Sequence, residues 1–253
     1  MLITDRRKKL FVKLENVFFS EDYRQYVSDA DIVLFLRSSN GISDAAAFNT
    51  LQIDLKKSEE ILFSEIRKNC RYEINRAERR DELFYSITDQ PLDSDINLFC
   101  SFYNEFAAAK NLPALSVEQL RTFRELKALT ISNIKAKEGD ILCSHLYVTD
   151  GKRALGLHFP SCFRKYTDKE FRSMVGRANK YLHWQDIRYF KSKGFYYYDF
   201  GGLACDSDDL DMTKVDEFKL HFGGNKVVEY DFYYPLTLKG RILLLLSRKK
   251  FSE

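Results

Sequence analysis

The most informative part of the chain lies between residues 181 and 224. It reads Tyr181-Leu-His-Trp-Gln-Asp-Ile187, then Lys191-Ser-Lys-Gly-Phe-Tyr-Tyr-Tyr-Asp-Phe-Gly-Gly202, and after an acidic loop Val215-Asp-Glu-Phe-Lys-Leu-His-Phe-Gly-Gly224. The pattern predicts a helix, a strand that ends at Asp199, a double glycine and a second short helix. This order places Asp199, Lys219 and His221 where loops leave a sheet, and clefts form at such edges.

The segments on either side predict a mixed α/β protein. Apolar spacing and serine N-caps predict helices over 58–80, 96–110 and 116–127, and a longer helix over 170–193. Asp150-Gly151 separates two apolar runs and predicts a β-hairpin, and alternation over 226–234 predicts a strand with one buried face. The 170–193 helix is apolar on two sides, so we expect it to pack against two layers.

Composition indicates a folded protein without strong charge. The 253 residues are 45% hydrophobic and 15% aromatic, and the net charge is +3. So small a charge excludes no partner class but gives a polyanion little support. The five cysteines are Cys70, Cys100, Cys143, Cys162 and Cys205; they lack metal-ligand spacing, so we expect reduced thiols and no metal. No apolar run has the length of a signal peptide or a membrane span, which predicts a cytoplasmic location.

The ordered motifs resemble the Fem family of aminoacyltransferases and the wider acyltransferases with the GCN5-related N-acetyltransferase (GNAT) fold. The resemblance rests on Tyr-Asp-Phe-Gly-Gly at 198–202, Phe-Lys at 218–219 and Phe-Gly at 222–223. Upstream it rests on residues 50–55, 71–78 and 102–106, so that it spans roughly residues 45–236. It implies a GNAT-like fold, in which helices flank a central, mostly antiparallel sheet whose neighbouring strands splay apart to receive an acyl donor.

We expect three parts within this chain. Residues 1–125 would form a reduced N-terminal subdomain with a basic helix, and residues 126–236 the GNAT-like acyltransferase core. Residues 237–253, apolar in the middle and cationic at both ends, would form a C-terminal helix that either docks on the core or rests on an anionic surface. A single elaborated domain is the alternative.

Acyl transfer to an amine requires a group that removes the amine's proton and a group that stabilises the developing oxyanion. The resemblance implies that Lys219 stabilises this charge; otherwise it is a solvated lysine near a helix end. Asp199 is a second catalytic candidate, although an aspartate here can equally cap the turn that follows. His158 and His221 are candidate bases because an imidazole titrates near neutral pH.

Several residues are candidates for substrate binding. Gly201 and Gly202 let the backbone approach a ligand closely, and Phe218 and Trp184 are aromatic residues within the informative region. Arg71 and Arg76 lie in the basic run 67–80, where they could hold an anionic acceptor, or this run could be a solvated helix face.

The stretch Arg172-Ser-Met-Val-Gly-Arg-Ala178 differs by one residue from the pyrophosphate-binding signature of coenzyme A-dependent relatives. We therefore expect no tightly bound cofactor, and an acyl donor that acts as co-substrate. An aminoacyl-tRNA is favoured over acyl-coenzyme A or an acyl carrier.

The sequence thus predicts an acyltransferase that forms an amide on an amine of a cell-envelope precursor, such as a peptidoglycan peptide or an amino sugar. One alternative is an acyl-coenzyme A or acyl-carrier-protein dependent N-acyltransferase of surface polysaccharide biosynthesis. Another is a non-catalytic RNA-binding or membrane-binding module, since the cationic segments at 6–9 and 239–250 could hold the protein at the inner face of the membrane.

Overall fold

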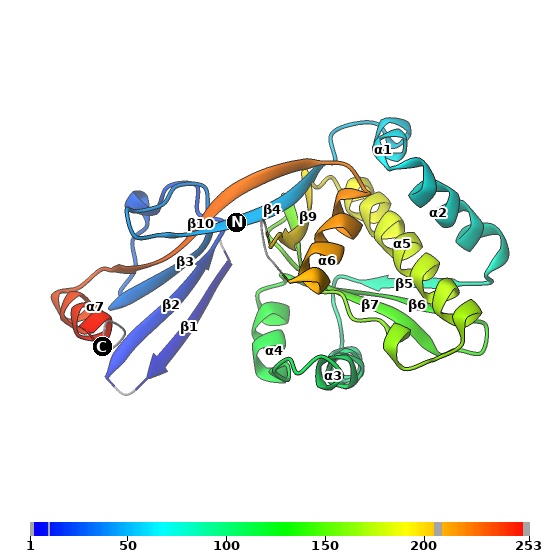
Figure 1. Cartoon of the computed structure of the whole chain (residues 1–253). Coiled ribbons are helices and arrows are strands. Elements are labelled where there is room, and N and C mark those ends of the chain that lie inside the picture. Colours follow the sequence, from blue (N-terminus) through cyan, green and yellow to red (C-terminus); the bar gives the residue numbers. More distant parts are fainter. Residues whose placement is uncertain (1–2, 10, 205–208, 250–253) are drawn as a thin grey trace. The chain divides into compact units, whose positions relative to one another are not determined.

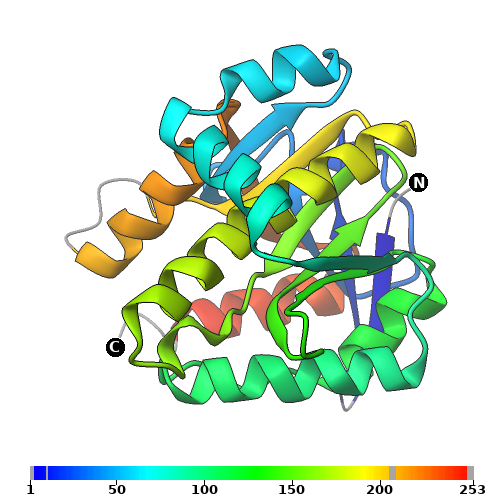
Figure 2. The same ribbon diagram turned by 90° about the vertical axis from the view of Figure 1, so that its right-hand side faces the viewer.

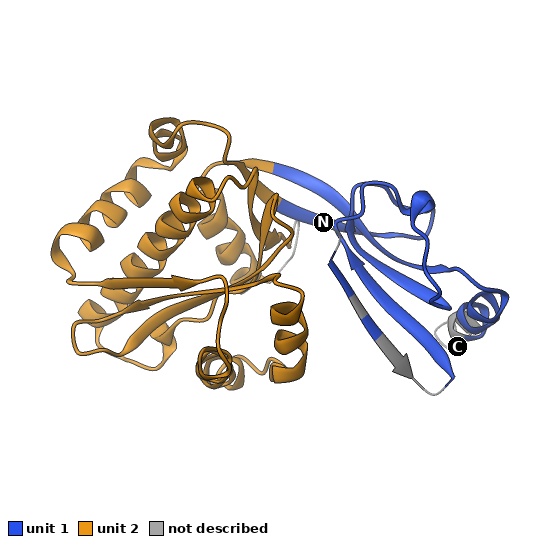
Figure 3. Ribbon diagram, turned by 180° about the vertical axis from the view of Figure 1, so that it is seen from behind, with its two compact units in different colours: residues 1–50, 226–253 blue, residues 51–225 orange. Residues whose placement is uncertain are grey.

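The computed structural model describes residues 3–9, 11–204 and 209–249. The chain forms two compact units, which Figure 3 colours separately. Unit 1 combines residues 1–50 with residues 226–253, and unit 2 comprises residues 51–225. These boundaries differ from the expected ones at 125 and 236. The reason is that residues 32–38 pair with the strand at 230–235, and residues so far apart in the chain cannot be matched from local sequence patterns.

Unit 1 is built on β1 (Ile3–Lys9), β2 (Val12–Phe18), β3 (Ile32–Ser38) and β10 (Asn225–Pro235), which neighbour one another in that order. β1 and β2 pair antiparallel, as do β3 and β10, whereas β2 and β3 run parallel. A short helix η1 (Tyr23–Gln25) and the terminal helix α7 (Leu238–Lys249) complete the unit. Its core contains Val17, Val33, Phe35 and Phe232.

Unit 2 holds the strand order β4-β9-β8-β7-β6-β5. The bounds are β4 (Ala46–Asp54), which enters from unit 1, β5 (Phe84–Thr88), β6 (Leu129–Lys135), β7 (Ile141–Thr149), β8 (Arg153–His158) and β9 (Tyr197–Gly202). β5 to β8 form an antiparallel series, and β8 and β9 run parallel. The predicted hairpin at Asp150-Gly151 is confirmed, as is the mixed α/β class with a largely antiparallel sheet.

Helices cover both faces of this sheet. They are α1 (Glu59–Glu65), α2 (Lys68–Arg80), α3 (Asp93–Ala108), α4 (Val117–Glu125), η2 (Cys162–Arg164), α5 (Lys169–Ser192) and α6 (Leu210–Leu220). Figures 1 and 2 show α2 and α5 on one face and α3 and α4 on the other. The ion pair of Arg177 with Asp81, at 2.6 Å, joins α5 to the end of α2.

The single helix predicted over 58–80 is wrong, because the chain breaks between α1 and α2. Ile66 and Arg67 adopt extended ψ angles of 136° and 141°. Arg71 secures the break by donating from Nη1 to the carbonyls of Ser64 and Ile66, both at 2.6 Å. The predicted N-caps Ser58 and Ser116 are confirmed.

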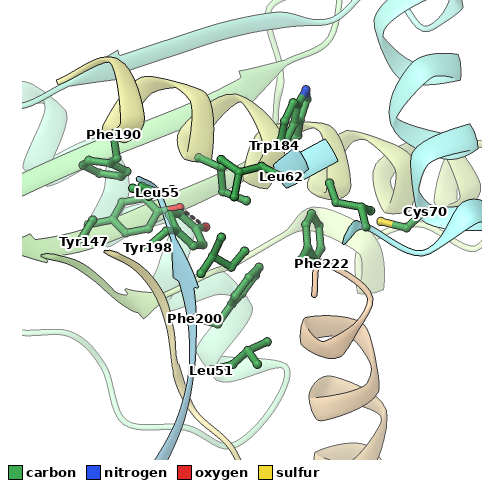
Figure 4. Packing of buried hydrophobic residues seen from close by; sticks show 14 of the residues in the cluster. Leu51, Leu55, Leu62, Cys70, Tyr147, Trp184, Phe190, Tyr198, Phe200 and Phe222 are labelled. Carbon is green, nitrogen blue, oxygen red and sulfur yellow. Dashed lines mark hydrogen bonds between the residues drawn. The ribbon is translucent and has the colours of Figure 1, made fainter. Parts of the chain in front are cut away.

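The long helix α5 packs against two layers, as its sequence predicted. Val175, Ala178 and Leu182 join one buried cluster. Trp184 and Ile187 join another, which Figure 4 shows in part. Because both sides of α5 are held by apolar contacts, polar groups on the remaining face have fixed positions.

β8 and β9 part from each other near the middle of the sheet. Their paired residues run from Arg153↔Tyr197 to Leu155↔Asp199, while the strands themselves continue to His158 and Gly202. The last close approach is at Gly201, whose φ is +71° and where a Cβ would lie 2.6 Å from the carbonyl oxygen of Gly156. Only glycine suits this position. The expected splay of neighbouring strands is therefore present between β8 and β9.

Other sequence expectations concern cysteines and the membrane. Cys70, Cys100, Cys143 and Cys162 are free thiols. Cys205, part of the acidic loop and residues 250–253 of the C-terminal segment lie outside the described residues. Among the helices that the structure describes, none combines the length and the apolar character that crossing a bilayer requires.

Candidate active site

A cavity of about 790 Å³ opens in unit 2 beyond the point where β8 and β9 part. Gly156 and Leu157 of β8, Phe200 and Gly202 of β9, and one face each of α5 and α6 line it. Its aromatic wall consists of Phe106, Phe159, Phe163, Phe200 and Phe218. An apolar cavity with convergent polar groups is the usual form of a small-molecule site.

Cations dominate the charged lining of this cavity. They are Lys110, Arg164, Arg172, Lys180, Lys214 and Lys219, whereas the described lining contains a single carboxylate, Asp211. Arg164 pairs with Asp211 at 2.9 Å, and Lys180 pairs with Glu73 of α2. The guanidinium of Arg172 lies over the Phe163 ring, 4.3 Å from its centroid. Such a lining suits a ligand that carries several negative charges.

Lys219 lies near the end of α6 and is only 8% exposed. Its ammonium donates a hydrogen bond to the carbonyl oxygen of Gly202, where β9 ends. Burial lowers the pKa of Lys219 from its usual 10.5, and the carboxylates of Asp216 and Asp199 oppose this shift. The sequence predicted a lysine at a cleft, and the structure places Lys219 in the cavity wall.

His183 of α5 lines the same cavity and is fully buried behind it. Burial lowers its pKa well below 6.5, and its electrostatic interactions with His145 and Lys219 lower the pKa further. The imidazole is therefore neutral near pH 7, which is the form that can accept a proton.

A chain of hydrogen bonds determines which nitrogen of His183 is basic. Tyr147 donates to the Asp186 carboxylate at 2.6 Å, so the oxygen of Tyr147 must accept from Tyr198, 2.8 Å away. The hydroxyl of Tyr198 then has no second proton and must accept from Nδ1 of His183 at 2.6 Å. The neutral ring is thus protonated on Nδ1, which leaves Nε2 as the nitrogen that carries a lone pair.

Asp186 anchors this network with 0% exposure. It also accepts from Ser132 at 2.8 Å and from Tyr85 at 3.0 Å, and Nδ1 of His145 lies 2.9 Å away. Nε2 of His145 in turn contacts the amide of Asn179, at 2.9 Å, which lines the cavity. Two cavity groups, His183 and Asn179, are therefore held by one buried carboxylate.

The sequence analysis missed His183, Asn179 and most of the cationic lining. One signal was available: Arg172, Gly176, Asn179 and His183 recur at helical spacing and occupy a single face of α5. The hydrogen-bond chain itself was not readable, because Asp186, Tyr147 and Tyr198 come from three different elements.

Asp199 does not line the cavity. Its carboxylate accepts from Arg153, from Gln52 at 3.1 Å and from the backbone N–H of Gly201 at 2.8 Å, and it is completely buried. The sequence suggested either a catalytic carboxylate or a cap of the turn that follows. These contacts match the cap, because one of them joins Asp199 to Gly201, two residues later in the chain.

The two histidines proposed from the sequence also lie outside the cavity lining. His158 packs against the Tyr103 ring, 4.6 Å between centroids. His221 ends α6, and its carbonyl oxygen accepts from the N–H of Arg67 at 2.8 Å. The structure therefore does not bring either ring to Lys219.

Three further candidates are spread over other parts of unit 2. Arg71 is engaged with the carbonyls between α1 and α2. Arg76 is exposed beside a separate depression near Asp168. Trp184 packs on Phe63, 4.9 Å between ring centroids, on a different side of α5. By contrast, Phe218 and Gly202 line the cavity, and Gly201 precedes Gly202 in the chain.

The start of α5 is ill suited to a pyrophosphate. Asp168 caps the helix by accepting from the N–H of Phe171 at 2.8 Å, and Glu170 occupies the first turn. A pyrophosphate bound there would meet two carboxylates where it needs free N–H donors. The described residues also contain no group of three or more His, Cys, Asp or Glu side chains arranged to hold a metal ion.

Two histidines whose pKa values are lowered in the folded protein should make the fold sensitive to acid. Burial lowers the pKa of His158 to about 4 and that of His183 well below 6.5. Below pH 6.5 the unfolded chain binds protons that the folded chain does not, so stability decreases as pH falls, by about 1.4 kcal/mol per pH unit for each histidine. When the free energy of unfolding is measured in urea between pH 6 and pH 4.5, His158→Phe should reduce its dependence on pH by the contribution of one histidine. The same pH dependence as in the wild type would contradict a lowered pKa at His158.

Comparisons with known proteins connect this geometry to a fold. No family model and no curated protein matches the chain. Among solved structures, FemX matches with a TM-score of 0.63 at 12% identity, over 97% of this chain and 85% of that one. L-PGS from Bacillus licheniformis matches with a TM-score of 0.55 at 14% identity, over 96% of this chain and 84% of that one.

A third similar structure is the C-terminal domain of an Agrobacterium fabrum protein assigned as a lysylphosphatidylglycerol synthetase. Its TM-score is 0.54 at 12% identity, over 93% of this chain and 81% of that one. The resemblance to the Fem family, drawn from the sequence, is thus confirmed at the level of the fold.

Proposed function

We propose that unit 2 is an acyltransferase that joins an acyl or aminoacyl group to an amine. One observation carries the proposal: a buried ammonium, Lys219, and a neutral histidine with its basic nitrogen defined, His183, line the same cavity. These are the two groups that the reaction requires, one for the oxyanion and one for the proton.

In the proposed step, the amine nitrogen forms a bond to the carbonyl carbon of the donor, and the carbonyl oxygen takes up the negative charge. The ammonium of Lys219 stabilises that charge. Nε2 of His183 accepts the proton that the attacking nitrogen loses. When the tetrahedral intermediate collapses, the bond from carbon to the donor oxygen breaks, and His183 returns the proton to that oxygen.

The donor we propose is an aminoacyl-tRNA. The cationic lining suits the phosphates of a nucleic-acid end, whereas the start of α5 carries Asp168 and Glu170 where coenzyme A would place its pyrophosphate. The resemblance to the Fem family supports the same donor. An acyl-coenzyme A or acyl-carrier-protein donor is the runner-up.

The acceptor we propose is an amine of a cell-envelope precursor, such as a peptidoglycan peptide or an amino sugar. The resemblance to the Fem family supports this class. Amide formation with each candidate acceptor, measured with a panel of charged tRNAs and acyl thioesters, tests both substrates. Failure of every donor in the panel would favour a non-catalytic binding module.

Gly176 allows the cavity to be filled without loss of stability. It lies within α5 and lines the cavity, and a Cβ added there would meet nothing within 4 Å. Gly176→Ala should stabilise the protein by about 1 kcal/mol through helix propensity, or about 2–4 °C in melting temperature. Gly176→Leu should keep most of that gain. Its side chain places three more carbons in the cavity than alanine does, and should therefore raise the KM for the donor about tenfold or more.

The alanine variant is the matched control, because it changes the helix but barely changes the cavity volume. Calorimetry and steady-state kinetics on the same samples separate the two effects. If Gly176→Leu is as stable as Gly176→Ala and retains the wild-type KM, this cavity is not the donor site.

A further inference from the structure

We propose that the outward face of α7, together with Phe11 directly before β2, docks unit 1 onto an anionic lipid bilayer. This surface belongs to unit 1 and is independent of the function proposed for unit 2. α7 is the last helix of the chain and lies within unit 1 (Figures 1 and 3).

One side of α7 is fixed to the protein. Thr237 caps the helix by accepting from the N–H of Gly240 at 3.1 Å, and it donates to Asp31 at 2.9 Å. Lys239 reaches the same carboxylate at 2.9 Å. At Gly240 a Cβ would lie 2.0 Å from the carbonyl oxygen of Asp31, so the helix backbone lies directly against the start of β3. The orientation of α7 on unit 1 is therefore determined.

The opposite side presents a continuous apolar stripe to solvent. Leu238, Ile242, Leu245 and Leu246 recur at i, i+4, i+7 and i+8, which is one face of a helix. Their exposed fractions are 74%, 50%, 64% and 58%. Large apolar side chains in such a row are rarely left in water without a binding partner.

A second element adds to this surface. Lys239 donates to the backbone carbonyl of Phe11, so Phe11, directly before β2, lies beside the start of α7. Phe11 is 84% exposed. Two neighbouring elements of unit 1 thus expose apolar side chains together.

Every charged residue in these two segments is cationic. The sequence of α7 contains two lysines and two arginines and no acidic residue, and residues 6–13 contain Arg6, Arg7, Lys8, Lys9 and Lys13 without an acidic residue. Arg6 pairs with the buried Glu15 at 2.8 Å and with Asp29 at 3.4 Å, and Lys13 pairs with Asp29 at 2.7 Å, so these two cations are partly neutralised. Apolar side chains that insert at the interface, flanked by cations that meet anionic headgroups, are the features by which helices bind membrane surfaces. Protein–protein interfaces, in contrast, are depleted in lysine.

Cosedimentation of the full chain with vesicles tests this proposal. We expect partitioning into vesicles containing phosphatidylglycerol to be at least tenfold stronger than into pure phosphatidylcholine, and to weaken as salt is raised. The double variant Ile242→Ser/Leu245→Ser should lose binding about tenfold or more, because each change removes about three insertable carbons. Arg241→Gln should lose about fivefold on anionic vesicles only.

Val27→Ser is the matched control, since Val27 is 91% exposed in unit 1 but lies outside both segments. It should bind vesicles like the wild type, and all variants should unfold at the same urea concentration. Equal binding to neutral and anionic vesicles, or full binding by the double variant, would overturn the proposal. The proposal would also be overturned if sedimentation equilibrium showed the wild type to be a dimer and the double variant a monomer, because this surface would then bind a second copy of the chain.

Discussion

Replacing Lys219 with methionine is expected to lower the rate of acyl transfer by about a hundredfold to a thousandfold, or roughly 3 to 4 kcal/mol in the barrier. Lys219 lines the cavity and is only 8% exposed, and away from bulk water a positive charge stabilises a developing oxyanion far better than it would in water. Turnover with the accepted donor, compared at saturating substrate, measures the effect. Unchanged turnover would exclude Lys219 from the mechanism.

Methionine is preferred to alanine because Lys219 is buried and its aliphatic stem fills space. Loss of the ammonium leaves the carbonyl of Gly202 without this donor, but it also removes a charge that burial disfavours. The two effects oppose each other, so the melting temperature should change by only a few degrees. Lys219→Arg should restore activity only in part, because the planar guanidinium is larger than the compact ammonium.

Replacing His183 with alanine is expected to lower the rate by about a hundredfold to ten-thousandfold, the usual range for loss of a general base. Since His183 is fully buried, the same change removes packing against Phe200 and Phe222, whose ring centroids lie 4.9 and 5.3 Å away. Loss of activity alone would therefore not separate a chemical role from a structural one.

Imidazole added to His183→Ala supplies that separation. If the histidine accepts a proton, free imidazole should enter the vacated space and restore activity in proportion to its neutral form, which increases as pH rises through about 7. Tyr198→Phe provides a second variant, because it removes the oxygen that accepts from Nδ1 while leaving the ring in place. That variant should keep the fold and lose part of kcat; an unaffected kcat would contradict the hydrogen-bond chain.

Local pattern was sufficient for part of the fold and for one side of the site. The hairpin at Asp150-Gly151 and the two-sided helix over 170–193 each follow from residues close in sequence, and both are confirmed. The strand over 226–234 is also present, but its predicted alternation is wrong at Val228, which is 51% exposed, and at Glu229, which is only 5% exposed. Gly202 ends a strand, and Phe218 and Lys219 lie on the helix that comes next in the chain. Short-range spacing is enough to bring such residues together.

The role of Asp199 could not be predicted from the residues close to it in the sequence. Its position after a strand and before two glycines suits a catalytic carboxylate and a turn cap equally well. Arg153, 46 residues away along the chain, and Gln52, 147 residues away, both bond to it in the folded protein. Those two distant donors share Oδ2 of Asp199, while the nearby N–H of Gly201 donates to Oδ1.

Sequence alone determined that this chain folds as a mixed α/β protein with one long helix between two layers, and that Lys219 lies near the end of the helix that follows the Tyr-Asp-Phe-Gly-Gly strand. These features depend on side-chain periodicity and on turn residues, which act over a few positions. Only the tertiary structure decided that residues 1–50 and 226–253 form a unit of their own, that the chain breaks at Ile66 and Arg67, and that His183 lines the cavity. The physical reason is the same in each case. The pairing of β3 with β10, the hydrogen bonds of Arg71 between α1 and α2, and the hydrogen-bond chain from Asp186 to His183 all join partners that meet only after the chain has folded.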